Sequence, residues 1–430
     1  MLFTIPRKSV ICSITSQLSQ EIPQIADIDS NIDSAEDEIL IERGSMSSAN
    51  QDSWTSLILI MIYEHLRGPA SRWKPYLDVL PTVFNTPMFW SENELKELQA
   101  SPVIEKIGKD NATEMIRSKI LPVIKQNPHV FFTDGAEYLG DDALEQLAYR
   151  MGSTIMAYAF DLEKDDDEGV EGEDEWVEDR EGQIMMGMVP MADILNADAE
   201  FNAHVDHGED YLTVTAIRAI RKGEEVLNYY GPLGNGELLR RYGYVTSKHK
   251  SYDLIDLSWD SILHSIRQEL RFNEKDWEKV KQMVDEEDFE DYFVIDHGAD
   301  EPDASGQMSA SSHGVNLPDD LWDQIKSFLK SVKQIFPELV ADKKKRDEVM
   351  YSAVLQALEA RLSAYTTTLE HDRAISRSGP MEERLRMALD VRMGEKLLLS
   401  QATTTVKERL GQLAAREGNS GEPPAKRRRT

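Results

Sequence analysis

The chain has 430 residues, enough for two domains with a sizeable core. Its 78 acidic and 48 basic residues give a net charge of −30, which argues against nucleic-acid binding through the overall field, because such binders neutralise phosphates. The charge suits a basic protein partner, and solubility alone is an equal explanation. The single cysteine, Cys12, excludes a disulfide framework and a cysteine-rich zinc site. No apolar run reaches the roughly 20 residues of a membrane helix.

The first 160 residues alternate between apolar patterns and polar segments. Ser91 and Glu94 have the spacing of a capping box, which marks the start of a helix. Residues 161–181 are densely acidic with little to bury, so we expect a disordered loop, which either attracts a basic substrate or has no fixed role. The other expected elements are a strand over 1–7, a polar loop over 21–50, and helices over 54–66, 105–132 and 144–160.

The segment 188–245 carries the most informative pattern. Residues 211–217 alternate apolar with polar side chains, which predicts a half-buried strand. Residues 225–230 predict a second short strand that ends at Gly231. A short helical turn is expected over 238–242, closed by Gly243.

Three motifs of this segment, PMADILNAD, GEEVLNYYG and NGELLRRYGYV, together resemble the C-terminal half of a SET domain. The variant is that of the Rubisco large-subunit methyltransferase class of protein-lysine methyltransferases. Within this class the chain looks most like the fungal ribosomal lysine N-methyltransferase 4 group, related to SET domain-containing protein 6. Each motif alone is a weak signal, but their order and spacing make the resemblance specific. It extends from Leu2 to about Leu399.

The resemblance implies an α+β fold with small, mostly antiparallel SET sheets, a pseudoknot, a helical insert and a C-terminal all-α lobe that contacts the substrate. Apolar residues at every fourth position support a helix in that lobe, namely Met350, Val354, Leu358 and Leu362. The expected divisions are a SET domain over 1–250, its insert over about 52–150, a helical lobe over 251–412 and a disordered basic tail over 413–430. Within the lobe we expect a linker or edge strand over 253–259 and an acidic loop over 285–312.

In the resembled family, the first strand follows a Gly-rich turn that cradles S-adenosylmethionine. The sequence begins at Met1 without that turn. We interpret the difference as a truncated gene model, and the alternative is an inactive or differently assembled protein.

Methylation of lysine is a direct displacement by the neutral amine, which is scarce at pH 7 because the pKa of free lysine is about 10.4. A dry channel lined by oxygens and aromatic faces lowers that pKa and aligns the nitrogen. By resemblance, Tyr230 is the catalytic tyrosine, and its hydroxyl is expected to orient the amine and contact the methyl group. The alternative is a core tyrosine with a satisfied hydroxyl.

Five further positions correspond to cofactor-binding and substrate-binding residues of the family, and one of them differs in residue type. Tyr242 matches a tyrosine that stacks beside the cofactor, and Asn196 matches an asparagine whose amide bonds the cofactor. Ala197 stands where the family has histidine, so only backbone contacts are expected there. Tyr158 lies where relatives place an aromatic or arginine residue near the cofactor, and Asp193 matches a substrate-contacting aspartate. The alternatives are packing for the tyrosines and turn or capping roles for Asn196 and Asp193.

These expectations favour an S-adenosylmethionine-dependent protein-lysine N-methyltransferase that needs no metal and acts on a basic ribosomal protein. The other hypothesis is a non-catalytic interaction module that has lost the cofactor site. We expect a monomer that binds neither nucleic acid nor membranes. The C-terminal run of lysine and arginine over 426–429 suggests nuclear import, with the cytoplasm as a second compartment, and the alternative is a stray charged terminus.

Overall fold

The computed structural model describes residues 3–6, 48–132, 138–162, 185–207, 211–284, 289–309 and 314–418. Most residues of the two predicted loops, 21–50 and 161–181, therefore lie outside the described residues. The tail predicted to be disordered from 413 is instead helical as far as Gly418, because residues 413–417 are mostly good helix formers. No helix within these ranges is long and apolar enough to cross a membrane.

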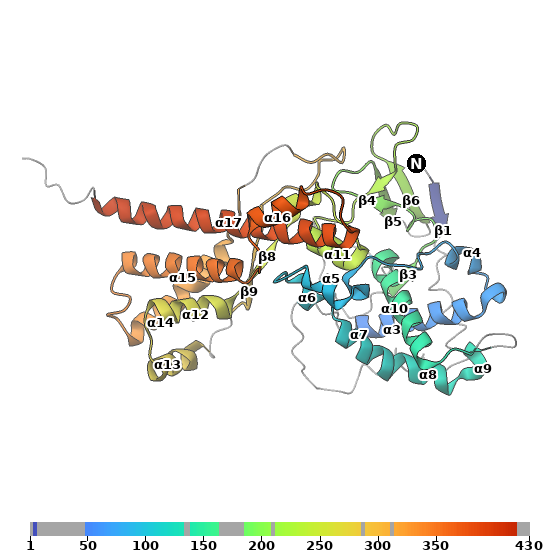
Figure 1. Ribbon diagram of the computed structural model, residues 1–430, viewed down its shortest axis with the longest axis horizontal. Helices are drawn as coiled ribbons and strands as arrows, with labels where there is room; N and C mark the ends of the chain where they lie inside the picture. Colours follow the sequence, from blue (N-terminus) through green and yellow to red (C-terminus); the bar gives the residue numbers. More distant parts are fainter. Residues whose placement is uncertain are drawn as a thin grey trace, which may run out of the picture.

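The strands within the first 231 residues form small sheets towards the right-hand side of Figure 1. The largest is antiparallel in the order β1 (Phe3–Pro6), β6 (Tyr211–Ala216), β5 (Ala203–His207). Two pairs complete this region: antiparallel β2 (Ala159–Leu162) with β3 (Met185–Met188), and parallel β4 (Asn196–Ala197) with β7 (Leu227–Asn228). The strand predicted over 225–230 is thus only two residues long, and the helix predicted to end at 160 ends at Tyr158, where β2 begins.

The helical insert is built around α3 (Ser48–Leu66). All seven side chains from Leu57 to Tyr63 are buried, so the helix is enclosed on every side rather than along one face. The predicted capping box is confirmed, since Ser91 and Glu94 cap α5 reciprocally. The remaining elements are η3 (Gly68–Ala70), α4 (Lys74–Leu77), η4 (Pro87–Phe89), α5 (Glu92–Lys96), α6 (Val103–Lys106), α7 (Lys109–Met115), the π-helical η5 (Ile116–Ile120), α8 (Leu121–Gln126), α9 (Pro128–Phe131) and α10 (Asp141–Tyr158).

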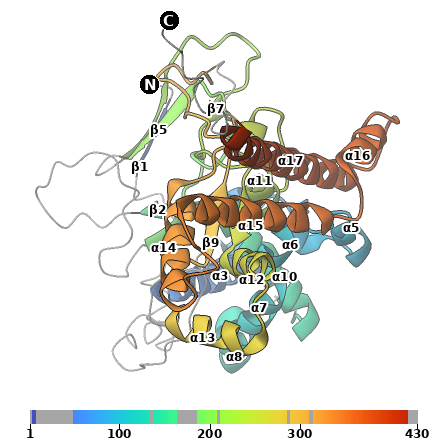
Figure 2. The same cartoon turned by 90° about the vertical axis from the view of Figure 1, so that its left-hand side faces the viewer.

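The C-terminal region is dominated by α17 (Glu383–Gly418), a helix of 36 residues that lies across α15 and α11 (Figure 2). One apolar core fills this region, and it includes the predicted face at Met350, Val354 and Leu358. Before this region come α11 (Asn235–Tyr242) and η6 (His249–Tyr252); its own elements are β8 (Ile255–Ser258), α12 (Trp259–Glu269), α13 (Glu274–Val284), β9 (Tyr292–Ile295), α14 (Asp319–Ile335), α15 (Lys343–Ser363), α16 (Leu369–Ser376) and α17.

The predicted loop over 285–312 is wrong at β9, which pairs antiparallel with β8. Phe293 and Ile295 of β9 are buried against the helices. Burial of these two apolar side chains stabilises a strand within an otherwise acidic segment. The lobe is therefore helical with a two-stranded sheet rather than all-α.

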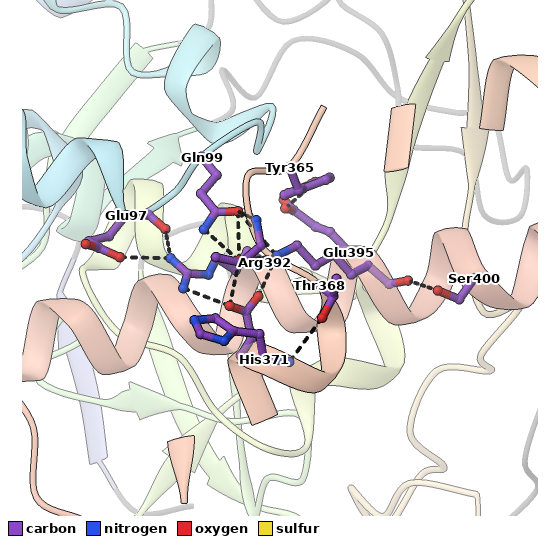
Figure 3. A network of polar contacts seen from close by, with 11 residues as sticks. Glu97, Gln99, Tyr365, Thr368, His371, Arg392, Glu395 and Ser400 are labelled. Atoms are coloured by element: carbon purple, nitrogen blue, oxygen red, sulfur yellow. Dashed lines mark hydrogen bonds and ion pairs between the residues drawn. The ribbon is translucent and has the colours of Figure 1, made fainter. Parts of the chain in front are cut away.

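A buried polar network joins α17 to the insert (Figure 3). Asp372 of α16 bonds the guanidinium of Arg392 at 2.9 Å and the ammonium of Lys396 at 2.5 Å. All three side chains have at most 1% of their surface exposed. Arg392 also bonds the carboxylate of Glu97 at 3.0 Å, and Lys396 lies 3.3 Å from the amide oxygen of Gln99. The network therefore fixes the position of the insert relative to α17.

Candidate active site

Three tyrosines from the segment after β7 pack into a cluster with their rings tilted against one another. The ring centroids of Tyr230 and Tyr242 are 5.0 Å apart, and those of Tyr242 and Tyr244 are 6.1 Å apart. Tyr230 follows β7 directly, whereas Tyr242 ends α11. The structure therefore brings together the predicted catalytic tyrosine and a predicted cofactor-binding tyrosine.

Two of these hydroxyl groups hold the backbone around Asn196. The Tyr230 hydroxyl donates to the Leu195 carbonyl at 2.6 Å, and the Tyr244 hydroxyl donates to the Ala197 carbonyl at 3.3 Å. Because the Tyr230 proton is engaged by Leu195, the lone pairs of its oxygen remain able to accept a hydrogen bond.

Asp193 lies beside the tyrosine cluster and receives a hydrogen bond from the insert. The hydroxyl of Tyr76 in α4 donates to its carboxylate at 2.5 Å, and the backbone N–H of Met191 donates as well. Burial outweighs these hydrogen bonds and raises the pKa of Asp193 to about 6. The carboxylate is thus ionised at neutral pH but close to its titration range.

The tyrosines and Asp193 share one electrostatic environment. Burial raises the pKa of Tyr158, and the neighbouring charge of Asp193 raises it further. The pKa of Tyr230 is raised by burial first, and then by Tyr242, Tyr244, Tyr158 and Asp193. The phenol of Tyr230 therefore stays protonated at neutral pH, so it orients a partner by hydrogen bonding rather than acting as a base.

Asn196 and Ala197 form β4, and their side chains differ in surroundings. The Asn196 side chain is exposed, and its amide donates to Glu225 at 2.6 Å rather than to a tyrosine of the cluster. Ala197 is buried, and its carbonyl is the one that Tyr244 holds. The cofactor-binding roles of these two residues stay predictions. His204 is exposed on β5.

Sequence reasoning missed three residues that shape this region. Tyr76 reaches Asp193 across 117 positions of chain, and no local pattern marks it. Tyr244 could have been found from the sequence, because it is the second tyrosine of the Tyr-Gly-Tyr motif that begins at Tyr242. Asn202 is fully buried, accepts from the Leu227 N–H at 2.9 Å and donates to the Glu225 carbonyl at 2.8 Å, so it fixes the start of β7.

The helix that carries Tyr242 is fixed at both ends. At its N-terminus, the buried carboxylate of Asp253 accepts from the Asn235 N–H at 2.9 Å, and burial raises the pKa of Asp253 to about 8. At its C-terminus, Gly243 has a φ of +76°, and a Cβ there would lie 2.9 Å from the backbone of Asn85 and Thr86. This close approach holds the insert against the tyrosine cluster.

Replacing Gly243 with alanine is expected to destabilise the protein by at least about 2 kcal/mol, because the new Cβ meets backbone that cannot move aside. The matched control is Gly223→Ala, where φ is +84° but no heavy atom lies within 4 Å of the added Cβ. The control substitution should lower the free energy of unfolding by only about 1 kcal/mol, because alanine then bears the cost of the left-handed conformation alone. Urea unfolding of both variants measures the difference, and equal losses would contradict a role for the close approach.

The cluster suits a reaction at a cationic or amine group. Aromatic faces attract cations, and the ionised Asp193 attracts an ammonium group. Within the part of the chain that the structure describes, no group of three or more His, Cys, Asp and Glu side chains is placed to hold a metal ion. Tyrosine rings beside a carboxylate are suited to an organic cation, such as a sulfonium or an ammonium group.

Comparison with known proteins identifies the family of the chain. A family model for the SET domain matches residues 3–231, more than half of the chain, and a model described as Rubisco LSMT substrate-binding matches residues 294–399. The chain therefore belongs to the SET domain family. The α+β fold and the family resemblance deduced from the sequence are both confirmed.

Particular relatives are similar over parts of the chain. Ribosomal lysine N-methyltransferase 4 of Saccharomyces cerevisiae is 36% identical over 279 residues, which are 63% of this chain and 52% of the yeast protein. N-lysine methyltransferase SETD6 of Homo sapiens is 34% identical over 213 residues, 48% of this chain and 41% of the human protein. The chain thus spans about half the length of these relatives. A solved structure of the LSMT SET domain bound to lysine and AdoHcy shares the fold, with a TM-score of 0.60 at 18% identity, covering 95% of this chain and 82% of the other.

Proposed function

We propose that this protein is an S-adenosylmethionine-dependent protein-lysine N-methyltransferase. The observation that carries the proposal is the convergence of Tyr230, Tyr242 and Asp193, which the motifs predicted and which come from separate elements of the fold. The yeast relative is named a ribosomal lysine methyltransferase, and a basic ribosomal protein suits a chain with a net charge of −30. We therefore infer that the target is a basic ribosomal protein.

Asp193 and Tyr230 have different roles in methyl transfer. Asp193 attracts the incoming ammonium group, and the buried aromatic surroundings favour loss of its proton, which leaves the neutral amine. The oxygen of Tyr230 accepts a hydrogen bond from that amine and so orients its lone pair. S-adenosylmethionine, when bound, would supply the methyl group: a C–N bond to the amine would form as the C–S bond broke, and S-adenosylhomocysteine would leave. The proton left on the product amine is then lost to water.

Cofactor binding and methyl transfer test the proposal together. Calorimetry should detect binding of S-adenosylmethionine, and labelled methyl groups should appear on lysines of purified ribosomal proteins. The measurement is made on the printed chain and on the protein extended upstream of Met1, since the chain covers about half of its relatives. Absence of binding and transfer in both would overturn the proposal and favour an interaction module.

The remaining parts of the proposal are a monomer that binds neither nucleic acid nor membranes and enters the nucleus. The basic run over 426–429 supports nuclear import, because such clusters act as import signals. Removing these four residues from a fluorescent fusion should shift the protein to the cytoplasm.

The reaction is expected to depend on the ionisation of Asp193. Its pKa of about 6 means that kcat/KM for a lysine peptide should fall as the pH drops through that value. Tyr76→Phe removes a hydrogen bond that lowers this pKa, so the fall should move to higher pH. The control is Tyr149→Phe, which removes a hydroxyl bonded to Thr113 within the insert and should leave the pH profile unchanged. An unshifted profile in the Tyr76 variant would rule out the coupling.

A further inference from the structure

Two large apolar side chains flank Asp193 and are exposed. Met191 has 56% of its surface exposed and Ile194 has 66%, whereas Ala192 and Leu195 in the same turn are buried. Single exposed apolar residues are common on protein surfaces. This pair differs because it lies on either side of a carboxylate that joins the insert to the tyrosine cluster.

The backbone of this turn holds Met191 in an unfavourable conformation. Its φ is +80°, in the left-handed region that glycine adopts freely and that costs other residues free energy. In this conformation the Met191 N–H donates to the carboxylate of Asp193, while the Asp193 N–H donates to the Val189 carbonyl at 3.3 Å. The strain therefore serves the orientation of the carboxylate, and such strain concentrates at functional sites. A glycine would satisfy the backbone, yet the chain has a long apolar side chain there.

We propose that Met191 and Ile194 form an apolar rim at the entrance to the site, which contacts side chains that neighbour the target lysine. The inference rests on the proposed function, and it defines the substrate more narrowly. The occupant is a segment of a basic protein in which an apolar side chain lies close to the lysine.

The geometry of an extended peptide indicates which neighbour of the target lysine contacts Met191 and Ile194. In an extended segment successive side chains point to opposite sides, so a side chain two positions from the lysine points the same way, about 7 Å along the chain. When the lysine enters beside Asp193, that side chain faces the surface next to the carboxylate. Met191 and Ile194 lie two positions before and one position after Asp193, so each is placed to cover such a side chain. Methionine suits this role because its flexible thioether adapts to varied apolar partners.

The test uses a peptide library with a fixed central lysine and all residues at the flanking positions, together with N-acetyl-lysine amide, which has no neighbours. The variant is Met191→Asn with Ile194→Thr. Asparagine tolerates the left-handed backbone, and threonine keeps the branched shape, so folding should be preserved. The control is Ile104→Thr, an exposed apolar residue on α6 of the insert.

The wild type should prefer an apolar residue over serine two positions from the lysine by roughly fivefold, the scale expected for partial burial of one side chain. In the double variant the preference should fall to under about twofold, and the rate on the apolar peptide should fall by a larger factor than the rate on N-acetyl-lysine amide. A wild type that methylates peptides without this preference, or a variant that retains it, would overturn the apolar rim alone. A wild type inactive on peptides, on the amide and on ribosomal proteins would overturn the proposed function and the rim together.

Discussion

Replacing Asp372 with alanine should lower the free energy of unfolding by about 3–5 kcal/mol, because it leaves two buried cations without their shared carboxylate. Arg392 and Lys396 are almost fully enclosed, and both bond Asp372. Burial alone would raise the pKa of Asp372, but hydrogen bonds from Arg392, Lys396 and Thr367 outweigh it and lower the pKa. The carboxylate is therefore ionised in the folded protein, and its charge is what the variant removes.

The matched control is Asp323→Ala. Asp323 also pairs with a lysine, Lys326 at 2.8 Å, but 72% of the Asp323 side chain is exposed. Such exposed pairs contribute about 0–1 kcal/mol, so this variant should unfold almost as the wild type does. Urea titrations of the three proteins provide the comparison. If the two aspartate variants lose the same free energy of unfolding, stable burial of Arg392 and Lys396 does not depend on Asp372.

A rescue experiment separates charge from packing. Replacing Asp372 with leucine, and Arg392 and Lys396 with methionine, removes every charge of the central triad and keeps most of its volume. Buried ion pairs are often replaceable by apolar side chains without loss, so this variant should be more stable than Asp372→Ala. Lower stability would mean that the hydrogen bonds from Lys396 to Thr367 and Gln99 contribute more than the charge balance does.

This network also marks a limit of prediction from sequence. Helical periodicity located the lobe and its apolar face, because burial of Met350, Val354 and Leu358 repeats along one helix. Arg392 and Lys396 have the residue types of a solvated face, since charged side chains are almost never fully buried unless paired. Their partner Asp372 comes from a different helix, so only the folded chain reveals that both positions are interior.

Some residues of the candidate site could likewise be predicted from the sequence, and others could not. Tyr230, Tyr242 and Asp193 could be located in advance, because ordered motifs carry them within 50 residues. Tyr76 could not, because it belongs to the insert and reaches Asp193 only through tertiary packing. Residues that converge from distant elements leave no period in the sequence, whereas residues on one strand or helix do. The strain at Met191 was invisible for a related reason: methionine carries no signal for a left-handed backbone.

Replacing Tyr230 with phenylalanine should lower kcat for lysine methylation by about 100-fold or more, the scale seen when one positioned hydrogen-bonding group is lost from an active site. The substitution removes the oxygen that orients the amine but keeps the ring that packs against Tyr242. Affinity for S-adenosylmethionine should therefore change by less than about threefold, because ring contacts are retained. Single-turnover kinetics and calorimetry measure the two quantities separately.

The adjacent Tyr229 provides the control for this experiment. Its ring stacks on Phe201 with centroids 5.1 Å apart, away from the Tyr230–Tyr242 pair, as expected for consecutive residues of an extended segment. Tyr229→Phe makes the same chemical change one residue away and should keep kcat within about twofold of the wild type, because its hydroxyl does not face the reacting amine. Equal losses in the two variants would mean that Tyr230 acts by supporting the fold. A loss confined to the Tyr230 variant, with cofactor affinity preserved, assigns its hydroxyl to the chemical step.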